Sequence, residues 1–323
     1  MEKVARAFWV TGPGQGEIRD TSLPARGKTD LLIRSAFSGV SRGTEALVFA
    51  GRVPVSERQR MRAPFQDGEF PGPVKYGYAN VGLVEEGPPD LRGRHVFSLF
   101  PHQTEFVLPV HAAHLLPDDV PPARAVLAAN VETAINGVWD GAPKPGDRVL
   151  VIGAGTVGCL VGWLVAAMPG VHCAVSDINL QRASVAAGLG VPFVQPDQLT
   201  ADWNLIVHAS GSEAGLLKAL EIAAPDGTIL EMSWFGDRTI SLPLGQAFHS
   251  RRLTLKSSQV GSLPPDKRTD WTRERRLDHA ISLLTTPALD ALITSESGFE
   301  ELPTVMAGLA RETPPGLMHR VRY

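Results

Sequence analysis

Short apolar stretches separated by glycine and proline turns fill the first 116 residues. They are Val4–Val10, Leu31–Val40, Asn80–Glu85, His95–Phe100 and Glu105–Val110. Runs of this length between turn residues predict β-strands. The segment 52–67 among them is charged and shows little alternation, so we expect a surface loop or short helix there, either solvated or contacting substrate. This part of the chain therefore predicts a β-rich domain.

From Val149 onward, apolar strand-like runs alternate with segments of helical spacing. The expected strands are Val149–Ile152, Val171–Ser176, Leu205–Ala209, Thr228–Met232 and Leu253–Lys256. The expected helices between them are Val157–Ala167, Arg182–Leu189 and Glu213–Ala223. Apolar strands joined by helices predict a parallel, doubly wound sheet of the α/β class.

A chain of 323 residues favours about two domains. We expect a β-rich domain over residues 1–117 and a doubly wound domain over residues 118–260. The remaining segment, 261–323, holds one helical pattern (Asp270–Leu284) and a strand-like ending (Leu317–Tyr323). It is too small for a separate domain, so we expect it to return and pack on the first one.

Composition and charge narrow the class of protein. The chain has 31 basic and 34 acidic residues, a net charge of −3, and no block of like charge, which disfavours a nucleic-acid partner. Its two cysteines, Cys159 and Cys173, suit a reducing compartment and cannot form a four-thiolate zinc site. The charged N-terminus and the absence of a long apolar run predict a cytoplasmic protein without membrane insertion.

The strongest chemical signal is a glycine turn that joins an expected strand to an expected helix. Gly153, Gly155 and Gly158 form G-x-G-x-x-G, and Asp177 ends the next strand nineteen residues after the last glycine. This pattern is typical of a dinucleotide site, with the pyrophosphate at the helix N-terminus and the acid on the ribose. An acid there repels a 2′-phosphate, so we expect NAD(H) rather than NADP(H). The residues expected to contact it are Gly153, Gly155, Thr156, Val157, Gly158, Asp177 and, flanking the adenine, Arg182.

Four motifs carry a resemblance to a known family. They are Ser38–Glu45 (Ser-Gly-Val-Ser-Arg-Gly-Thr-Glu), Gly77–Gly82, Pro145–Val149 and Ala209–Gly211. Over its whole length the chain resembles the medium-chain dehydrogenase/reductase (MDR) superfamily. The resemblance implies a GroES-like catalytic domain followed by a Rossmann NAD(H)-binding domain. It also implies cofactor contacts at Thr133, Ser210 and Gly211, and a homodimer formed through the edge strand near residues 253–256.

The zinc ligands of that superfamily are missing from this sequence. Ser41 or Arg42 stands where a cysteine ligand belongs, and Tyr78-Ala79 replaces a His-Glu pair. The third ligand position, near Ala128, is apolar, and the cysteine-rich structural zinc lobe is absent. Catalytic zinc takes three protein ligands from Cys, His, Asp and Glu. We therefore expect an enzyme that binds no zinc.

Without a metal, hydrogen-bond donors must polarise the substrate oxygen. Tyr78 is the first candidate because it resembles a replacement of a metal-binding histidine; the alternative is that it only packs in the β-rich domain. Thr44 matches the threonine that relays the substrate proton in the family. Glu45 either pairs with Arg42, which would hold the loop from Ser41 to Glu45 rigid, or acts as a general base.

Three functions remain open at this point. The first is an NAD(H)-dependent, zinc-independent oxidoreductase that interconverts a secondary alcohol and a ketone on a small-molecule substrate. The motif Ser38–Glu45 with Leu47–Gly51 looks most like the branch containing bacteriochlorophyllide a dehydrogenase, which makes a side chain of a bulky ring one candidate substrate. The others are an NADPH-type enoyl or quinone reductase, and a dinucleotide-binding sensor or structural subunit without turnover.

Overall fold

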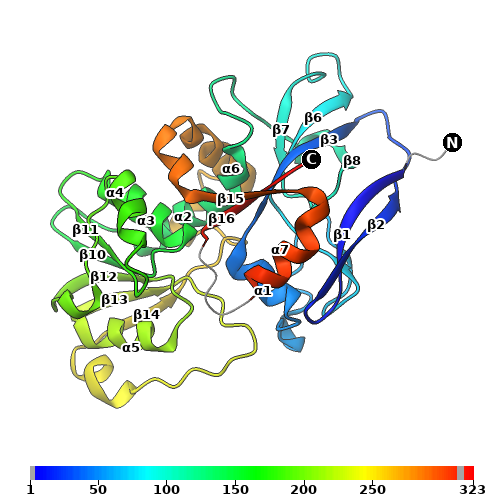
Figure 1. Cartoon of the computed structure of the whole chain (residues 1–323). Helices are drawn as coiled ribbons and strands as arrows, with labels where there is room; N and C mark the ends of the chain where they lie inside the picture. Colours follow the sequence, from blue (N-terminus) through cyan, green and yellow to red (C-terminus); the bar gives the residue numbers. More distant parts are fainter. Residues whose placement is uncertain (1–3, 311–315) are drawn as a thin grey trace. The chain divides into compact units, whose positions relative to one another are not determined.

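The computed structural model describes residues 4–310 and 316–323 and groups the chain into two compact units. The first unit comprises Met1–Ala129 with Ile281–Tyr323, and the second comprises Asn130–Ala280. Figure 1 draws their elements in chain order. The boundaries expected at residues 117 and 260 stay predictions.

The first unit is built from two sheets. The smaller has the order β2-β1-β5-β4, and the larger β15-β16-β3-β6-β7-β9 with β8 also paired to β3. The strands of the smaller sheet are β1 (Val4–Gly12), β2 (Gln15–Ser22), β4 (Asp67–Gly68) and β5 (Val74–Lys75). Those of the larger are β3 (Asp30–Val40), β6 (Asn80–Glu86), β7 (His95–Ser98), β8 (Glu105–Pro109), β9 (His114–Leu115), β15 (Ile293–Gly298) and β16 (Met318–Arg322). The α-helices are α1 (Arg42–Phe49) and α7 (Leu302–Leu309).

The last strand joins the first unit through backbone pairing. β16 pairs antiparallel with β3, where Val321 lies opposite Ser38, and parallel with β15. His319 and Val321, two positions apart on β16, are 6% and 0% exposed, as one face of a half-buried strand should be. The strand-like pattern at the end of the sequence thus corresponds to a real strand, and it brings Tyr323 beside β3.

The second unit is a five-stranded parallel sheet with helices. Its order is β11-β10-β12-β13-β14, and every neighbouring pair is parallel. The strands are β10 (Arg148–Ile152), β11 (His172–Ser176), β12 (Trp203–His208), β13 (Ala223–Glu231) and β14 (Thr254–Ser257). The helices are α2 (Ala128–Gly141), which begins in the first unit, α3 (Thr156–Ala166), α4 (Arg182–Gly188), α5 (Glu213–Ile222) and α6 (Arg273–Ser282).

The strand order of this sheet explains its two layers of helices. The chain runs from β10 outward to β11, and then returns to β12 on the other side of β10. Right-handed crossovers in opposite directions place helices on opposite faces, and in Figure 1 α3 and α4 lie on one side of the sheet and α5 on the other. The reversal between β10 and β12 is the point at which such sheets bind ligands.

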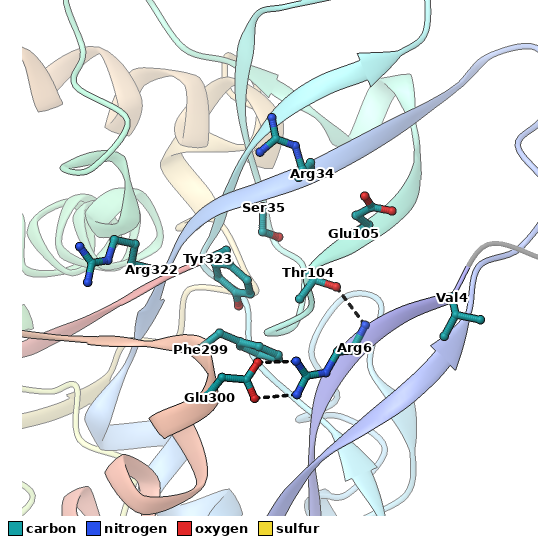
Figure 2. Close-up of a pocket in the computed structure, with 10 residues that line it drawn as sticks. All are labelled: Val4, Arg6, Arg34, Ser35, Thr104, Glu105, Phe299, Glu300, Arg322 and Tyr323. Carbon is teal, nitrogen blue, oxygen red and sulfur yellow. Dashed lines mark hydrogen bonds and ion pairs between the residues drawn. The ribbon is translucent and has the colours of Figure 1, made fainter.

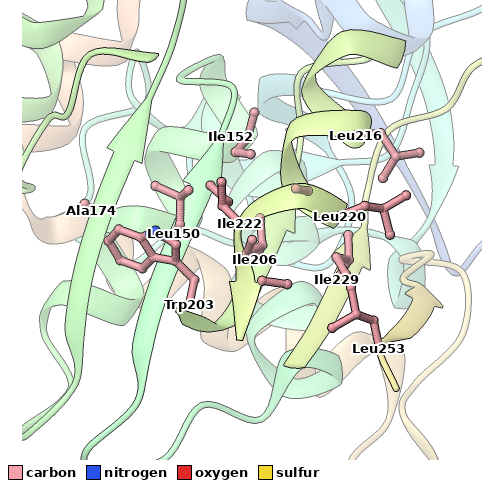
Figure 3. Packing of buried hydrophobic residues seen from close by; sticks show 12 residues of the cluster. Leu150, Ile152, Ala174, Trp203, Ile206, Leu216, Leu220, Ile222, Ile229 and Leu253 are labelled. Atoms are coloured by element: carbon pink, nitrogen blue, oxygen red, sulfur yellow. The ribbon is translucent and has the colours of Figure 1, made fainter. Parts of the chain in front are cut away.

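One hydrophobic core cluster of the second unit lies between the sheet and α5. Leu150, Ile206 and Ile229 from three neighbouring strands pack with Leu216 and Leu220 of the helix (Figure 3). All five are buried, and Ile206 is fully so. This packing fixes β10 and β12, the two strands whose ends carry the expected cofactor residues.

Some elements were not expected from the pattern. Ile18 is the single large apolar residue of β2. This strand lies at the edge of its sheet and is held by its hairpin with β1. The helix α1 is short and begins with Arg-Gly. No helix within the described residues is both long and apolar enough to cross a membrane.

Replacing Ile206 by Ala should lower the free energy of unfolding of the second unit by about 2–5 kcal/mol. The substitution would leave a cavity in the packed cluster between the sheet and α5. The matched control is Leu217→Ala on the exposed side of α5, which should change it by no more than about 0.5 kcal/mol. Urea unfolding followed by circular dichroism measures both; equal effects would show that this cluster is not the core.

Candidate functional site

The glycine turn after β10 is packed so closely that two of its glycines have no substitute. A Cβ on Gly153, where φ is +106°, would lie 2.6 Å from backbone atoms of Ser210. A Cβ on Gly158 would lie 1.8 Å from the carbonyl oxygen of Gly153. In contrast, no heavy atom lies within 4 Å of the Cβ position of Gly155, which precedes the first residue of α3. The turn therefore leaves open space at a helix N-terminus, as a pyrophosphate requires.

Asp177 follows β11 and is fixed by backbone donors on both carboxylate oxygens. Oδ2 accepts from the Ala154 N–H of the glycine turn at 2.8 Å, and Oδ1 accepts from the Asn179 N–H at 2.8 Å. A carboxylate oxygen has room for a second donor, so each can also accept from a ribose hydroxyl. Asp177 is thus oriented by the same turn that would hold the pyrophosphate.

Three other expected cofactor residues lie on helices beside Asp177. Thr156 and Val157 begin α3 and are partly exposed. Arg182 begins α4 but is buried, and its charge acts on the Cys159 thiol. Burial raises the pKa of Cys159 to about 12, Arg182 opposes this shift and Asp177 adds to it. Arg182 therefore lies within the unit near Asp177, and its role at the adenine stays a prediction.

The loop after β12 is held by a buried histidine. His208 Nδ1 lies 2.6 Å from Glu231 Oε2, and its Nε2 lies 2.7 Å from Ser210 Oγ. The Gly211 N–H donates to Ser233 Oγ at 3.0 Å. Because a carboxylate only accepts, Nδ1 carries the proton and Nε2 accepts from Ser210. Ser210 is thereby held by His208, and backbone atoms of Ser210 lie against Gly153 of the glycine turn.

Thr133 lies on α2, is partly exposed, and follows a buried ion pair. Glu132 Oε1 accepts from Arg276 Nε at 3.0 Å, and Arg276 is 1% exposed. Arg276 also donates to the carbonyl of Val260 and the side chain of Asn136. This pairing joins α2 to α6 within the second unit and so sets the position of Thr133.

In the first unit, the start of α1 holds a buried carboxylate. Ser41 precedes the helix, and its N–H donates to Glu45 Oε1 at 2.7 Å. His102 Nε2 lies 2.8 Å from Glu45 Oε2. Glu45 and His102 are 3% and 1% exposed. The expected pairing of Glu45 with Arg42, the first residue of α1, stays a prediction; the contacts of Glu45 include those with Ser41 and His102.

Tyr78 meets α1 through hydrogen bonds. Its hydroxyl bonds to the side chains of Ser41 and Thr44. Burial raises the pKa of Tyr78 to about 12, the charge of Glu45 adds to the shift, and the two hydrogen bonds oppose it. The structure thus brings together Ser41, Thr44, Glu45 and Tyr78, which sequence reasoning had named from separate motifs.

Two residues of this site were not expected. His102 Nδ1 lies 2.7 Å from Ser38 Oγ, and Ser38 Oγ lies 3.0 Å from the Tyr323 hydroxyl. A Cβ on Gly77 would lie 3.0 Å from the His102 ring, so the chain passes close to the imidazole there. The sequence offered one indication of these residues, their position at strand ends. His102 follows an expected strand by two residues, and Tyr323 is the last residue of another.

The side chains around Tyr78 do not match a zinc site. Zinc prefers thiolate, imidazole and carboxylate ligands. Here the Tyr78 hydroxyl bonds to the side chains of Ser41 and Thr44, Glu45 bonds to the His102 imidazole, and Ala128 is fully buried. Within residues 4–310 and 316–323, no three His, Cys, Asp or Glu side chains group closely enough to hold a metal.

Known proteins resemble this chain in sequence over part or most of its length. No family model matches. An uncharacterized zinc-type alcohol dehydrogenase-like protein of Haemophilus influenzae is 27% identical over 218 residues, 62% of this chain and 59% of that protein. The 2-desacetyl-2-hydroxyethyl bacteriochlorophyllide A dehydrogenase of Rhodobacter capsulatus is 28% identical over 260 residues, 74% of this chain and 76% of the enzyme. The match therefore spans less than two thirds of the first relative.

Solved structures share the fold over the whole chain. L-idonate 5-dehydrogenase from Escherichia coli K-12 has a TM-score of 0.81 at 13% identity, covering 100% of this chain and 99% of that one. A putative zinc-binding dehydrogenase from Sinorhizobium meliloti bound to NADP has a TM-score of 0.78 at 15% sequence identity, and the match covers 100% of both chains. A short chain alcohol dehydrogenase from Escherichia coli CFT073 complexed with NADH has a TM-score of 0.77 at 17% sequence identity, and the match covers 99% of both chains. The predicted fold class, a GroES-like domain with a Rossmann domain, and the resemblance to dehydrogenases are confirmed.

Gly155→Ala should raise the Kd for NADH at least about tenfold, because its methyl group would occupy the open space where a pyrophosphate fits. Its Tm should stay near that of the wild type, since the backbone there suits alanine. Gly158→Ala is the comparison: its Cβ meets the Gly153 carbonyl, so Tm and binding should both fall. NADH fluorescence and thermal unfolding measure these; tight NADH binding by Gly155→Ala would show that the turn is not the pyrophosphate site.

Proposed function

Because this chain shares the fold and the homologues of the medium-chain dehydrogenases/reductases, we propose that it is an NAD(H)-dependent, zinc-independent oxidoreductase of secondary alcohols and ketones. The observation that carries the proposal is the hydroxyl cluster of Ser41, Thr44 and Tyr78 beside the buried Glu45. It stands where the superfamily's zinc ligands would be expected, and it supplies hydrogen-bond donors instead of metal ligands.

Tyr78 would donate a hydrogen bond to the substrate oxygen. A donor aimed at an oxygen that gains negative charge lowers the barrier to its formation. Since the pKa of Tyr78 is about 12, the phenol keeps its proton throughout the neutral range. Thr44 and Ser41 orient this hydroxyl, and the nicotinamide, when bound, supplies or accepts the hydride.

The cofactor proposal rests on Asp177. Its carboxylate is held in place by Ala154 N–H and Asn179 N–H, so a 2′-phosphate at the same position would meet a fixed negative charge. Structures with this fold include one bound to NADP and one bound to NADH, so the fold itself permits either cofactor. We propose NAD(H) from the acid alone.

The same two features weigh against the other functions. Asp177 disfavours an NADPH-type enoyl or quinone reductase. A sensor or structural subunit without turnover has no need of a tyrosine hydroxyl held by two neighbours beside a buried carboxylate. A side chain of a bulky ring remains the candidate substrate, supported by the similarity to the bacteriochlorophyllide relative.

Three further expectations remain predictions. They are the domain boundaries at residues 117 and 260, the cytoplasmic location, and a homodimer through an edge strand of the second unit. For the dimer, β14 lies at the end of the sheet order and all four of its residues are exposed. An exposed edge presents unpaired backbone groups to a second copy.

Asp177→Ser should shift preference from NADH toward NADPH by at least about tenfold in the ratio of Kd values, because the charge that repels a 2′-phosphate is removed. Asp197→Ser changes an exposed acid elsewhere in the second unit and should leave the ratio unchanged. Fluorescence titration of both cofactors measures the ratios. Tighter binding of NADPH than of NADH by the wild-type protein would contradict the assignment.

Tyr78→Phe should lower kcat by about 10²-fold or more on a substrate found by screening secondary alcohols, ketones and hydroxyethyl tetrapyrroles with NAD(H). Tyr76→Phe is the matched control, since Tyr76 packs edge-on against Tyr78 at 6.0 Å between ring centroids. NADH absorbance follows turnover.

Metal analysis of the same preparations completes the test. We expect far less than one zinc per chain and turnover that survives a chelator. Stoichiometric zinc would overturn zinc independence, and full activity of Tyr78→Phe would remove Tyr78 from the reaction.

A further inference from the structure

An unbroken row of hydrogen-bonding side chains runs through the first unit from Glu45 to Tyr323. Glu45 Oε2 to His102 Nε2 is 2.8 Å, His102 Nδ1 to Ser38 Oγ is 2.7 Å, and Ser38 Oγ to the Tyr323 hydroxyl is 3.0 Å. We propose that this row, the Glu45–Tyr323 chain, carries protons between Glu45, whose charge acts on Tyr78 of the hydroxyl cluster, and a pocket lined by Tyr323. The proposal rests on the proposed function, because an alcohol–ketone reaction releases or consumes one proton.

The hydrogen bonds of the Glu45–Tyr323 chain can all point the same way, each group donating toward Glu45. The Glu45 carboxylate only accepts, so His102 Nε2 carries a proton and donates it. Nδ1 of the neutral imidazole then accepts from the Ser38 hydroxyl, and Ser38 Oγ accepts from the Tyr323 hydroxyl. The imidazole is the one group of the four that can take a proton on one side and release another on the opposite side.

Inward transfer during ketone reduction is balanced at each atom. The Nε2–H bond breaks as an O–H bond forms on Glu45, while the Ser38 O–H bond breaks as Nδ1–H forms. The Tyr323 O–H bond breaks as Ser38 regains its proton, and Tyr323 takes a proton from water. One proton moves from solvent, where it leaves a hydroxide ion, to Glu45, whose carboxylate becomes a neutral acid, and the imidazole ends with its proton on Nδ1. Alcohol oxidation runs the same steps in reverse and starts from that Nδ1–H tautomer.

The outer end of the chain reaches an open pocket. Tyr323 lines a pocket of about 500 Å³ together with Ser35, Thr104, Phe299 and the Arg6–Glu300 ion pair (Figure 2). The Tyr323 ring stacks on Phe299 at 4.8 Å between centroids. Ser38 and His102 behind it are 0% and 1% exposed. The lining includes the charged side chains of Arg6 and Glu300, which suit water, and Tyr323 is partly exposed, so the proposal places the exchange with water at Tyr323.

The segment that carries His102 is anchored on both sides. Asn80 Nδ2 donates to the Pro101 carbonyl at 3.1 Å, and the Ser35 hydroxyl donates to the Gln103 carbonyl. The ring therefore keeps its orientation between Glu45 and Ser38. A path for proton transfer needs such alignment. If these positions served only to fill the interior, apolar side chains would stabilise the fold at least as well.

Other titratable groups face this imidazole and bear on its protonation. They are Glu45, Tyr323 and His319 of β16. Burial lowers the pKa of His319, and the neighbouring His102 lowers it further, while Glu296 and Glu301 oppose the shift. Because burial raises the pKa of Tyr323, its phenol stays protonated and passes a proton on only as it receives one.

The test measures exchange of the His102 ring proton with water by NMR on full-length protein labelled with 15N-histidine, with the signal assigned by His102→Gln. Tyr323→Phe removes only the hydroxyl and should slow this exchange by more than about tenfold, because the path is cut. Tyr76→Phe, a buried tyrosine outside the chain, should leave it unchanged. Equal or faster exchange in Tyr323→Phe would overturn the proposal.

A second variant covers a failure of Tyr323→Phe to fold. Ser38→Ala removes the middle hydroxyl, and it should slow exchange in the same way while NADH binding to the second unit is retained. Exchange unaltered in folded Ser38→Ala would equally overturn the proposal.

Kinetics separate this proposal from the proposed function. On an alcohol that is turned over, Tyr323→Phe should lower kcat and enlarge its solvent isotope effect, with KM and the Kd for NADH unchanged. Slowed exchange without any turnover would count against the alcohol reaction alone. Turnover with unchanged exchange and an unchanged isotope effect would count against the proton path alone.

Discussion

Burial of the Glu45 carboxylate at the start of α1 is the constraint from which the polar interior of the first unit follows. A buried charge costs several kcal/mol unless hydrogen bonds replace its water. Oε1 takes the Ser41 N–H and Oε2 takes His102, which then needs a partner for its other nitrogen. Ser38 supplies that partner from β3, and Tyr323 completes the set because β16 pairs with β3. The C-terminal segment that returns to the first unit as β16 thus contributes to the hydrogen bonds that lead to Glu45.

The second unit repeats the same arrangement of side chains. Glu231, His208 and Ser210 follow one another at 2.6 and 2.7 Å, as Glu45, His102 and Ser38 do in the first unit. In each case the carboxylate selects which ring nitrogen carries the proton, and the other nitrogen holds a serine hydroxyl. The consequences differ: Ser210 is held on a loop against the glycine turn, whereas Ser38 leads on to Tyr323. The arrangement in the second unit holds the loop with the expected cofactor residues Ser210 and Gly211, and the one in the first unit continues to Tyr323.

How far the sequence could predict these features depends on the separation of the residues involved. Strands β10 to β14 and the turn with Asp177 follow from local periodicity and spacing, which a sequence displays directly. β2 was missed because an edge strand needs few apolar residues. The partners of His102 lie 57 and 64 residues away, and those of Ser38 reach 285 residues to Tyr323. No local pattern records such pairs, because they depend on tertiary structure; the pairing of β16 with β3, for example, brings Tyr323 to Ser38. The same holds for His208 and Glu231, which meet only once β12 and β13 are paired.

Exchanging metal ligands for hydroxyls changes what the protein must do with the substrate proton. A metal ion lowers the pKa of an oxygen bound to it, so the proton can leave before hydride transfer. A phenol with a pKa of about 12 stabilises negative oxygen by donation but does not ionise an alcohol at neutral pH. The proton must then pass to a base in the same step as the hydride, and Glu45, the general-base candidate from the sequence, is the carboxylate whose charge acts on Tyr78. A base buried in this way works repeatedly only if its proton is removed between turnovers. The proposed path through His102 and Ser38 to Tyr323 would meet that requirement, so in this proposal the hydroxyls at the expected zinc-ligand positions and the buried histidine serve the same reaction.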